Sequence, residues 1–176
     1  MKTDNAHTRL REARELGHEA RVRDNDHAAL KLWLRLLACT TQIEDEVKRR
    51  LRSGFNVSLA RFDYLAQLYR HGGLKMRDLS RFLMVTGGNV TGLTDELERD
   101  GLVARETDPN DQRGRIVRLT AKGRRAFETM AREHETWILE MFGGLDARAV
   151  KQLHDHLGTL RVHLMRSESA APENSA

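Results

Sequence analysis

A chain of 176 residues with a formal net charge of +4, 39% hydrophobic residues and two prolines is long enough for one domain with a substantial core, and its composition favours a mainly helical fold. A single cysteine, Cys39, excludes an intrachain disulfide and a zinc site built from several cysteines. No apolar run reaches the roughly 20 residues of a membrane span, and the N-terminus has charges where a signal peptide needs an apolar stretch, so we expect a cytoplasmic protein without a membrane partner.

The first part of the chain is expected to form an arm and two helices. Residues 1–27 alternate in charge sign and hold few large apolar side chains, which predicts a flexible charged arm. From Asp26 to about Arg52 the apolar residues recur mostly at steps of three and four, which predicts a long amphipathic helix. Ser58 is placed to cap a second helix that runs to about His71, where Gly72-Gly73 would stop it.

Two further helices separated by a short turn are predicted next. The first runs from about Lys75 to Phe82, and Leu83-Met84-Val85 turns the chain into the second. Thr86 is the expected N-cap of that second helix, which ends near Asp100-Gly101. Its buried stripe is expected to consist of Val90, Leu93 and Leu97.

A β-hairpin is predicted after the second of these helices. Gly101–Arg105 has the residue types of a strand, Asp108–Gly114 those of a turn, and Arg115–Thr120 those of a returning strand. Thr120 is also placed to cap the helix that follows. Between residues 99 and 125, eight Lys and Arg stand against four acids, so positive charge gathers around the hairpin. Helix, turn, helix and basic hairpin in this order are typical of a winged helix-turn-helix, which predicts duplex DNA as the partner.

The chain ends in two amphipathic helices whose apolar and aromatic residues recur at steps of three and four. In the first of them these residues are Phe127, Met130, His134, Trp137 and Met141, and in the second they are Val150, Leu153, Leu157, Leu160 and Leu164. Together with the first long helix, they hold more apolar surface than one small winged domain can cover, which predicts a homodimer joined through a helical seam. The alternative is that they pack back on their own subunit.

The expected fold is a mainly α single domain with a small antiparallel β-wing, extending over residues 28–166. Within it, residues 28–57 and 126–166 are expected to form the dimerisation region, and residues 58–125 the DNA-binding lobe. The small, polar residues 167–176 are predicted to be a frayed tail.

The predicted recognition helix opens with small and polar residues. Such a helix enters the major groove N-terminus first, so its first turn must allow close approach and offer polar contacts. Asn89 can read an adenine edge, while Thr86 and Thr91 can contact phosphates or thymine methyl groups. The same segment holds the glycines Gly87, Gly88 and Gly92. Each glycine costs a helix roughly 1 kcal/mol relative to alanine, which indicates another reason for its presence. A loose turn between two helices is the alternative.

Cationic side chains of the hairpin and its surroundings are the other candidate DNA contacts. Arg113 and Arg115 flank the predicted turn and can enter a narrow minor groove, which attracts guanidinium groups. Asp111 can accept hydrogen bonds from Arg113 and fix its direction, whereas Asp108 and Asn110 are expected to form the turn. Further candidates for phosphate contacts are Arg77, Arg81 and Lys122. Their alternative role is ordinary solvated surface charge.

The residues from about Leu30 to Leu164 resemble the MarR family of bacterial transcription regulators. The most specific motif is Asp111–Thr120, DQRGRIVRLT, preceded by Leu97–Val103, LERDGLV. This resemblance implies a homodimer joined by its first and last helices, with two winged lobes that read a pseudo-palindromic operator. It also implies repression relieved by a small ligand, often a phenolic or aromatic acid, bound between the dimer region and the winged lobe. At the matching positions, Asp111 braces the wing and Arg113 reads the minor groove.

A second resemblance concerns Leu32–Glu44 and Arg61–Leu65, which are similar to family members that control the catabolism of benzoate and hydroxycinnamates. Some of those members sense the aryl-coenzyme A thioester, which suggests an aromatic acid or its thioester as the effector. The candidate ligand-binding residues are Trp33, Arg35, Cys39, Arg61 and Phe62. The two aromatic side chains can flank a ring and the two arginines can meet a carboxylate or phosphate. Ordinary packing and surface exposure are the alternatives.

Two other functions are open to the same sequence. Cys39 can act as an oxidant sensor if its thiol has a low pKa, for which Tyr64 and Tyr69 are the available tyrosine partners. A metal-dependent enzyme would have to use His154, His156 and His163, but the first two point to nearly opposite sides of a helix. The chain also lacks a glycine-rich phosphate loop, a nucleophile motif and an HExxH pair. We therefore expect a regulator that is not an enzyme, without catalytic residues, bound metal or cofactor.

Overall fold

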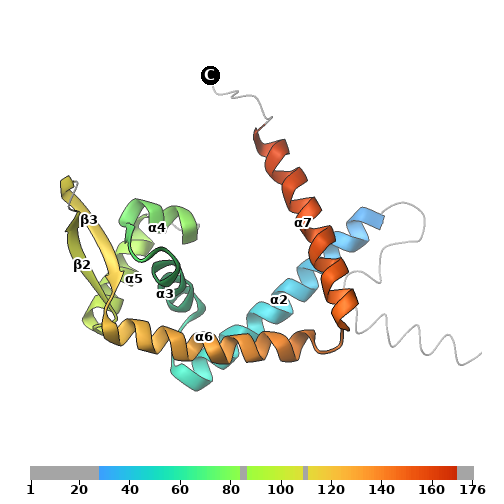
Figure 1. Ribbon diagram of the computed structural model, residues 1–176, viewed down its shortest axis with the longest axis horizontal. Helices are drawn as coiled ribbons and strands as arrows, with labels where there is room; N and C mark the ends of the chain where they lie inside the picture. Colours follow the sequence, from blue (N-terminus) through green and yellow to red (C-terminus); the bar gives the residue numbers. More distant parts are fainter. Residues whose placement is uncertain (1–27, 84–86, 109–110, 170–176) are drawn as a thin grey trace, which may run out of the picture. The chain divides into compact units, whose positions relative to one another are not determined.

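The computed structural model describes residues 28–83, 87–108 and 111–169, except the side chains of residues 111–113 and 167–169 (Figure 1). The expected arm (1–27), the predicted turn residues Met84 and Val85, the predicted N-cap Thr86 and the turn residues Pro109 and Asn110 therefore lie outside the described residues. Of the predicted frayed tail, residues 170–176 also lie outside them, whereas residues 167–169 belong to the last helix. The chain divides after His134 into two compact units. None of the described helices is both long enough and apolar enough to cross a membrane.

The first two described helices end within a few residues of their predicted C-terminal ends at Arg52 and His71. Helix α2 spans Ala28–Phe55, and helix α3 spans Leu59–His71. The hydroxyl of Ser58 caps α3 by accepting a hydrogen bond from the backbone N–H of Arg61 at 3.3 Å. Gly72, in the left-handed conformation with a φ of 71°, ends the helix, as the paired glycines predict.

The two helices of the predicted helix-turn-helix are α4, Met76–Leu83, and α5, Gly87–Arg99. The predicted buried stripe of α5 is partly wrong. Val90 and Leu97 are buried as expected, but Thr94 is the third buried residue and Leu93 is only half-buried. Thr94 is tolerated in the core because its hydroxyl has hydrogen-bond partners there.

A three-stranded antiparallel sheet has the order β1-β3-β2, with β1 at Leu74–Lys75, β2 at Val103–Asp108 and β3 at Asp111–Leu119. The predicted turn, Asp108–Gly114, is wrong. Pairing continues to Asp108↔Asp111, with a register shift after Thr107, so the residues from Asp111 to Gly114 belong to β3. The short strand β1 was not predicted, because two residues show no alternation that a sequence pattern can detect.

The core of the first unit joins the winged lobe to its neighbouring helices. Figure 1 shows α3, α4 and α5 grouped beside the β2–β3 hairpin. The fully buried side chains come from all of these elements and from α2: Leu51, Tyr64, Leu65, Leu68, Leu79, Val90, Leu97, Val103 and Val117. Since burial of one such aliphatic side chain contributes roughly 1.5–3 kcal/mol, this cluster fixes the relative positions of α5 and the hairpin.

Helix α6, Ala121–Phe142, begins in the first unit and ends in the second. The backbone N–H of Gly123 donates to the hydroxyl of Thr120 at 3.0 Å, which confirms the predicted cap. The second unit contains the end of α6 and helix α7, Ala147–Ser169, whose first turn is capped by Asp146. The predicted apolar stripe of α7 is exposed in this single chain: Val150, Leu153, Leu157, Leu160 and Leu164.

Candidate nucleic-acid interface

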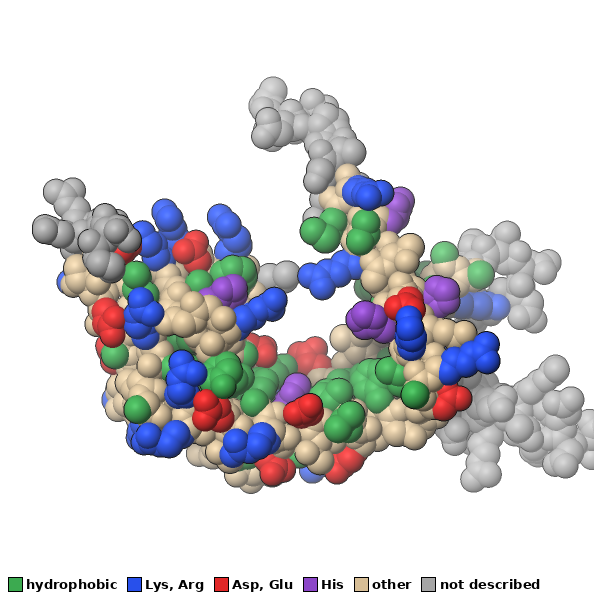
Figure 2. Space-filling model, viewed as in Figure 1, with side chains coloured by type: hydrophobic (Ala, Val, Ile, Leu, Met, Phe, Trp, Pro, Cys, Tyr) green, Lys and Arg blue, Asp and Glu red, His purple; other side chains and the backbone are tan. Residues whose placement is uncertain are grey.

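Helix α4 carries two exposed cations beside the recognition helix. Leu79 is buried on the inner face of α4, while Arg77 and Arg81 lie on its outer surface. Arg77 Nε lies 3.7 Å from a carboxylate oxygen of Asp78, and 78% of the Arg77 side chain is exposed. In Figure 2, Lys and Arg side chains project from the region that contains α4 and the hairpin. A polyanion can therefore reach this surface without disturbing the core.

The first half of α5 has an unusually open surface. A Cβ atom added to Gly87, Gly88 or Gly92 would meet no heavy atom within 4 Å, and none of these glycines has a positive φ. Neither internal packing nor backbone conformation therefore requires glycine at the three positions. Their cost to the helix, roughly 1 kcal/mol each, is not balanced by a contact within the described structure. Gly88 and Gly92 also line the cavity between α5 and α3 that is described below. Glycine thus leaves open space around the backbone of this half of the helix.

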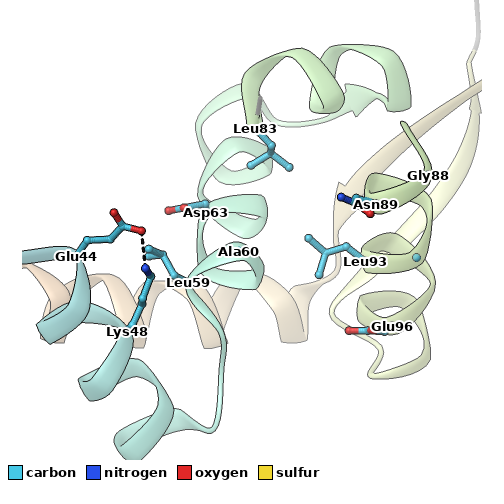
Figure 3. Close-up of a pocket in the computed structure, with 11 residues that line it drawn as sticks. Glu44, Lys48, Leu59, Ala60, Asp63, Leu83, Gly88, Asn89, Leu93 and Glu96 are labelled. Atoms are coloured by element: carbon cyan, nitrogen blue, oxygen red, sulfur yellow. Dashed lines mark ion pairs between the residues drawn. The ribbon is translucent and has the colours of Figure 1, made fainter. Parts of the chain in front are cut away.

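The two polar residues of this half face different surroundings. The hydroxyl of Thr91 donates to the carbonyl of Gly87 at 3.1 Å and remains exposed. Asn89 lies on the side of α5 that it shares with Leu93 and Glu96, and Figure 3 shows this side turned to a cavity between α5 and α3. The exposed amide of Asn89 thus lies at the border between the outer surface of α5 and that cavity.

The second half of α5 is tied to the core through Thr94. The hydroxyls of Tyr64 and Thr94 are 2.6 Å apart, and both side chains are fully buried. Thr94 Oγ1 also lies 2.6 Å from the carbonyl of Val90, so Tyr64 donates to Thr94 and Thr94 donates to that carbonyl. Burial raises the pKa of Tyr64, which keeps its hydroxyl protonated as the donor. This chain of hydrogen bonds fixes α5 on α3.

Arg105 ties the same half of α5 to strand β2. Its guanidinium forms ion pairs with Asp95 and Glu98 of α5. Its backbone N–H also donates to Glu98 at 3.1 Å. Because one residue of β2 contacts two carboxylates on one face of α5, the recognition helix and the wing form a connected pair.

The hairpin has two further attachments that sequence reasoning missed. Asp108, expected as a turn residue, is 2% exposed and lies 2.6 Å from the ammonium of Lys75 in β1. Arg118 Nη1 donates to the carbonyl of Gly72 at 2.6 Å, while its Nε pairs with Glu106 at 3.0 Å. No sequence spacing signals these contacts, since the partners are brought together by the pairing of β1 with β3 and of β2 with β3.

Three residues of the wing, Asp111, Arg113 and Arg115, are predicted to act in DNA binding, and the structure describes the side chain of Arg115. It is exposed, and its Nη1 donates to the hydroxyl of Thr107 at 2.5 Å. Because this partner is a neutral hydroxyl, it leaves the positive charge of Arg115 available. The side chains of Asp111 and Arg113 lie outside the described residues.

Lys122, the third predicted phosphate contact, lies at the other end of α5. Its ammonium donates to the carbonyl of Asp100 at 2.8 Å. Since α5 has 13 residues, this site is roughly 20 Å from the glycine-rich turn. Lys122 is therefore separated from Arg77 and Arg81 by about the length of the recognition helix.

The five predicted ligand-binding residues have separate surroundings. Trp33, Arg35 and Cys39 are exposed on the first half of α2. On α3, Phe62 packs against Phe127 and His134, with ring centroids 5.5 and 5.0 Å apart. The neighbouring Arg61 instead pairs with Asp100. Of the five residues, only Arg61 lines either of the two cavities described next.

One cavity, of about 640 Å³, lies between α2, α3, α4 and α5, and we call it the Glu44 cavity (Figure 3). Its charged lining residues are Glu44, Lys48, Asp63 and Glu96. Lys48 pairs with Glu44 at 2.7 Å, the contact drawn as a dashed line. Burial raises the pKa of Asp63, and the charge of Glu44 raises it further. With three carboxylates and one ammonium on its wall, this cavity disfavours anions.

A second cavity, of about 510 Å³, lies where the α2–α3 loop, the end of α5 and the start of α6 meet, and we call it the Arg61 cavity. Its charged residues are Arg61, Asp100 and Lys122. The pKa of Asp100 is lowered, mainly by its hydrogen bond from the guanidinium of Arg61. The remaining lining residues are Phe55, Asn56, Val57, Leu102, Ala126, Thr129 and Met130. This cavity thus combines an excess of positive charge with a largely apolar wall.

The described residues contain no group of three or more His, Cys, Asp and Glu placed to hold a metal ion. His154, one of the three histidines considered above, lies on α7 with its Nδ1 3.6 Å from the carboxylate of Asp155.

The chain is similar to transcription regulators in its sequence and its fold. The pattern that defines the MarR family matches residues 57–114. The transcriptional activatory protein BadR of Rhodopseudomonas palustris is 34% identical over 152 residues, covering 84% of this chain and 86% of BadR. The HTH-type regulator YkoM of Bacillus subtilis is 34% identical over 120 residues, covering 68% of this chain and 77% of YkoM. In fold, the chain resembles the C80S mutant of Escherichia coli MarR in complex with operator DNA, with a TM-score of 0.66 and 24% identity over 78% of this chain and 99% of that one.

Proposed function

Because this chain belongs to the MarR family of transcriptional regulators, we propose that it binds operator DNA through α4, α5 and the β2–β3 wing. We propose that it represses transcription there, as the family resemblance implies, whereas the relative BadR is an activatory protein. The observation that carries this proposal is the open space at Gly87, Gly88 and Gly92, where an added Cβ atom would meet no heavy atom of the described residues within 4 Å. A helix that approaches a DNA groove closely has a use for glycine, because a side chain at these positions would hold the backbone away from the DNA.

The proposed contacts divide into those that read bases and those that fix the position of the protein. Gly87 and Gly88 let the N-terminal backbone N–H groups of α5 approach DNA, where they can also bind a phosphate. Thr86, Asn89 and Thr91 are the proposed polar contacts in the major groove.

The remaining proposed contacts are cationic. Arg77 and Arg81 would bind phosphates beside the major groove, and Lys122 is the predicted phosphate contact at the far end of α5. Arg113 and Arg115 would enter the minor groove from the wing, with Asp111 holding Arg113 in place.

We further propose that the chain acts as a homodimer on a pseudo-palindromic operator. In support, α7 leaves Leu157 and Leu164 38% and 54% exposed, and α2 leaves Trp33 56% exposed. Exposed apolar side chains at helical spacing are typical of association surfaces. A two-fold dimer would present two winged lobes, which matches an operator with two half-sites.

The proposed signal is an aromatic acid or its coenzyme A thioester, whose binding releases the DNA. Of the predicted ligand residues, Arg61 has the chemistry and the location for the acidic group, because it lines a cavity with an apolar wall. The other four, Trp33, Arg35, Cys39 and Phe62, remain candidates for a longer ligand such as a thioester.

The proposal is tested by fluorescence anisotropy with a labelled duplex from the region upstream of the protein's own coding sequence. We expect tight binding that weakens steeply with salt, because phosphate contacts release counterions from DNA. A panel of aromatic acids and aryl-coenzyme A thioesters is then added to find the compound that releases the duplex. Equal affinity for this duplex and for an unrelated duplex at every salt concentration would contradict operator recognition.

A further inference from the structure

We propose that the Arg61 cavity is the effector site and that it binds a carboxylate attached to a small apolar body, in competition with Asp100. This inference rests on the proposed function, since it names the place and the chemistry of its signal. The competing carboxylate follows the last residue of the recognition helix directly. Its release is therefore a route from the ligand to the DNA-reading surface.

Charge selects between the two cavities that adjoin α5. The Glu44 cavity has Glu44, Asp63 and Glu96 against Lys48, so an anion placed there meets net repulsion. The wall of the Arg61 cavity has Arg61 and Lys122 against Asp100. An organic acid that reaches α5 is therefore favoured in the second cavity.

Arg61 also has hydrogen-bonding capacity that the protein itself leaves unused. Its Nη2 binds Asp100, but its Nε is buried and has no hydrogen-bond partner among the described residues. A guanidinium binds a carboxylate best in bidentate form, through two parallel N–H donors. A ligand carboxylate on Nε and Nη2 would satisfy the unpartnered donor, and it would take Nη2 from Asp100.

The rest of the wall defines the body of the ligand. Phe55, Val57, Leu102 and Met130 give the cavity an apolar lining. Its volume of about 510 Å³ lies within the usual range for small-molecule sites, roughly 300–1,000 Å³. Lys122 completes the site as a second cation, held by the carbonyl of Asp100. An acid with one aromatic ring fits these requirements.

The position of Asp100 couples this site to DNA. Asp100 lies between the end of α5 at Arg99 and the start of β2 at Val103, so both DNA-reading elements meet beside it. When the ligand takes Arg61, the ion pair that ties this junction to α3 is lost. By linkage, if the acid lowers the affinity of the protein for the operator by some factor, the operator lowers the affinity of the protein for the acid by the same factor.

The experiment is isothermal titration of the full chain with benzoate and cinnamate, compared with neutral benzamide and inorganic phosphate. Wild-type protein is expected to bind the two acids and to bind benzamide and phosphate at least tenfold more weakly. R61Q and Lys122→Gln are expected to lose at least tenfold in acid affinity. Two matched controls, Arg70→Gln on the exposed end of α3 and Lys48→Gln in the Glu44 cavity, should keep wild-type acid affinity.

The variant Asp100→Asn tests whether Asp100 competes with the ligand for Arg61 or only forms a structural ion pair with it. If Asp100 competes with the ligand, this variant binds benzoate severalfold more tightly than wild type and holds operator DNA less tightly. Unchanged acid affinity in Asp100→Asn, or wild-type acid affinity in R61Q with its helical circular dichroism intact, would overturn the proposal. So would loss of acid binding in Lys48→Gln, a preference for phosphate, or the absence of acid binding by the wild type. Operator affinity measured without acid tests the proposed function separately, because it does not depend on this cavity being a ligand site.

Discussion

The two halves of the recognition helix differ in what holds them. From Thr94 onward, α5 is attached to α3 by Tyr64 and to β2 by Arg105. Before Thr94, Val90 is buried, but a Cβ atom added to any of the three glycines would meet no heavy atom of the described residues within 4 Å, and the hydroxyl of Thr91 donates within its own helix. The second half thus fixes the direction of the helix, and the first half leaves its backbone accessible. Substitutions in the two halves should therefore damage different properties, and the predictions below test that separation.

The largest expected effect is on the attached half and concerns folding. Leu97 is fully buried, whereas Leu93, one turn earlier, is half-buried and lines the Glu44 cavity. Leu97→Ala should lower the free energy of unfolding by about 3 kcal/mol, while Leu93→Ala should lower it by about 1 kcal/mol because less packing is lost. Urea denaturation followed by circular dichroism measures both values, and equal losses would contradict the assigned burial.

The next prediction concerns DNA affinity in the open half. Gly88→Gln should leave folding intact or improve it, because a Cβ atom at this position meets no heavy atom within 4 Å and glutamine is a better helix former. Operator affinity should fall by at least about 2 kcal/mol, roughly 30-fold, because the side chain blocks close approach. Gly54→Gln on α2 is the matched control, since Gly54 is also helical and borders open space. Equal operator affinity in the two variants would show that the glycines have no role in DNA binding.

The sequence predicts the elements of α5 and its neighbours better than it predicts their contacts. Helix ends are local, so the cap at Ser58 and the stop at Gly72 could be inferred from the residues themselves. A threonine is not counted among the apolar residues that mark the buried face of a helix. The hydrogen-bond partner of Thr94, Tyr64, is 30 residues away, so the burial of Thr94 could not be inferred from the sequence. At the hairpin, turn-forming residues such as Asp108 suggested a long turn, but strand pairing continued through them.

The candidate site shows the same limit. Arg77, Arg81 and Arg115 are exposed. Exposure is expected for them both as DNA contacts and as solvated surface charges. The sequence offers Arg61 and Phe62 together as ligand residues, because the segment Arg61–Leu65 resembles aromatic-acid regulators and the two side chains suit an acidic group and a ring. Adjacent helical residues point about 100° apart, however, and these two contact different neighbours. Only the folded chain reveals which of them lines a cavity.

Substitutions in the wing should have effects of intermediate size on operator affinity. Unlike substitutions in the attached half of α5, they should not change stability. Arg113→Ala should reduce specific operator affinity by about 1–3 kcal/mol and leave the unfolding transition unchanged. Arg115→Ala should give a similar but smaller loss, because part of its hydrogen bonding is used by Thr107. Lys122→Ala, as a phosphate contact, should mainly lower the salt dependence of binding. Anisotropy titrations on operator and unrelated duplexes at several salt concentrations separate these effects. Operator affinity that is the same in Arg113→Ala as in the wild type would refute the assignment of the wing.

The hydrogen bond that attaches α5 to α3 can be isolated with a double-mutant cycle. Thr94→Val keeps the shape of the side chain but leaves the buried hydroxyl of Tyr64 without its partner, so unfolding should become easier by about 1–2 kcal/mol. The double variant Tyr64→Phe with Thr94→Val removes both polar groups and should recover most of that loss. Additive losses in the cycle would mean that the two hydroxyls act independently.

The smallest expected effect lies beneath the open half of α5, at Asp63 in the Glu44 cavity. Burial and the nearby Glu44 raise the pKa of Asp63 above its usual 3.8, so the folded protein holds this proton more tightly than the unfolded chain. The resulting stabilisation is complete below the unfolded pKa and is lost as the pH rises through the folded pKa. Asp63→Asn should therefore raise stability at pH 7 by about 0.5 kcal/mol, and the gain should vanish below pH 3.8. Thermal melts across this pH range, with Glu133→Gln on exposed α6 surface as control, measure the difference. A gain that persisted in acid would show that Asp63 affects packing through its shape and not through its charge.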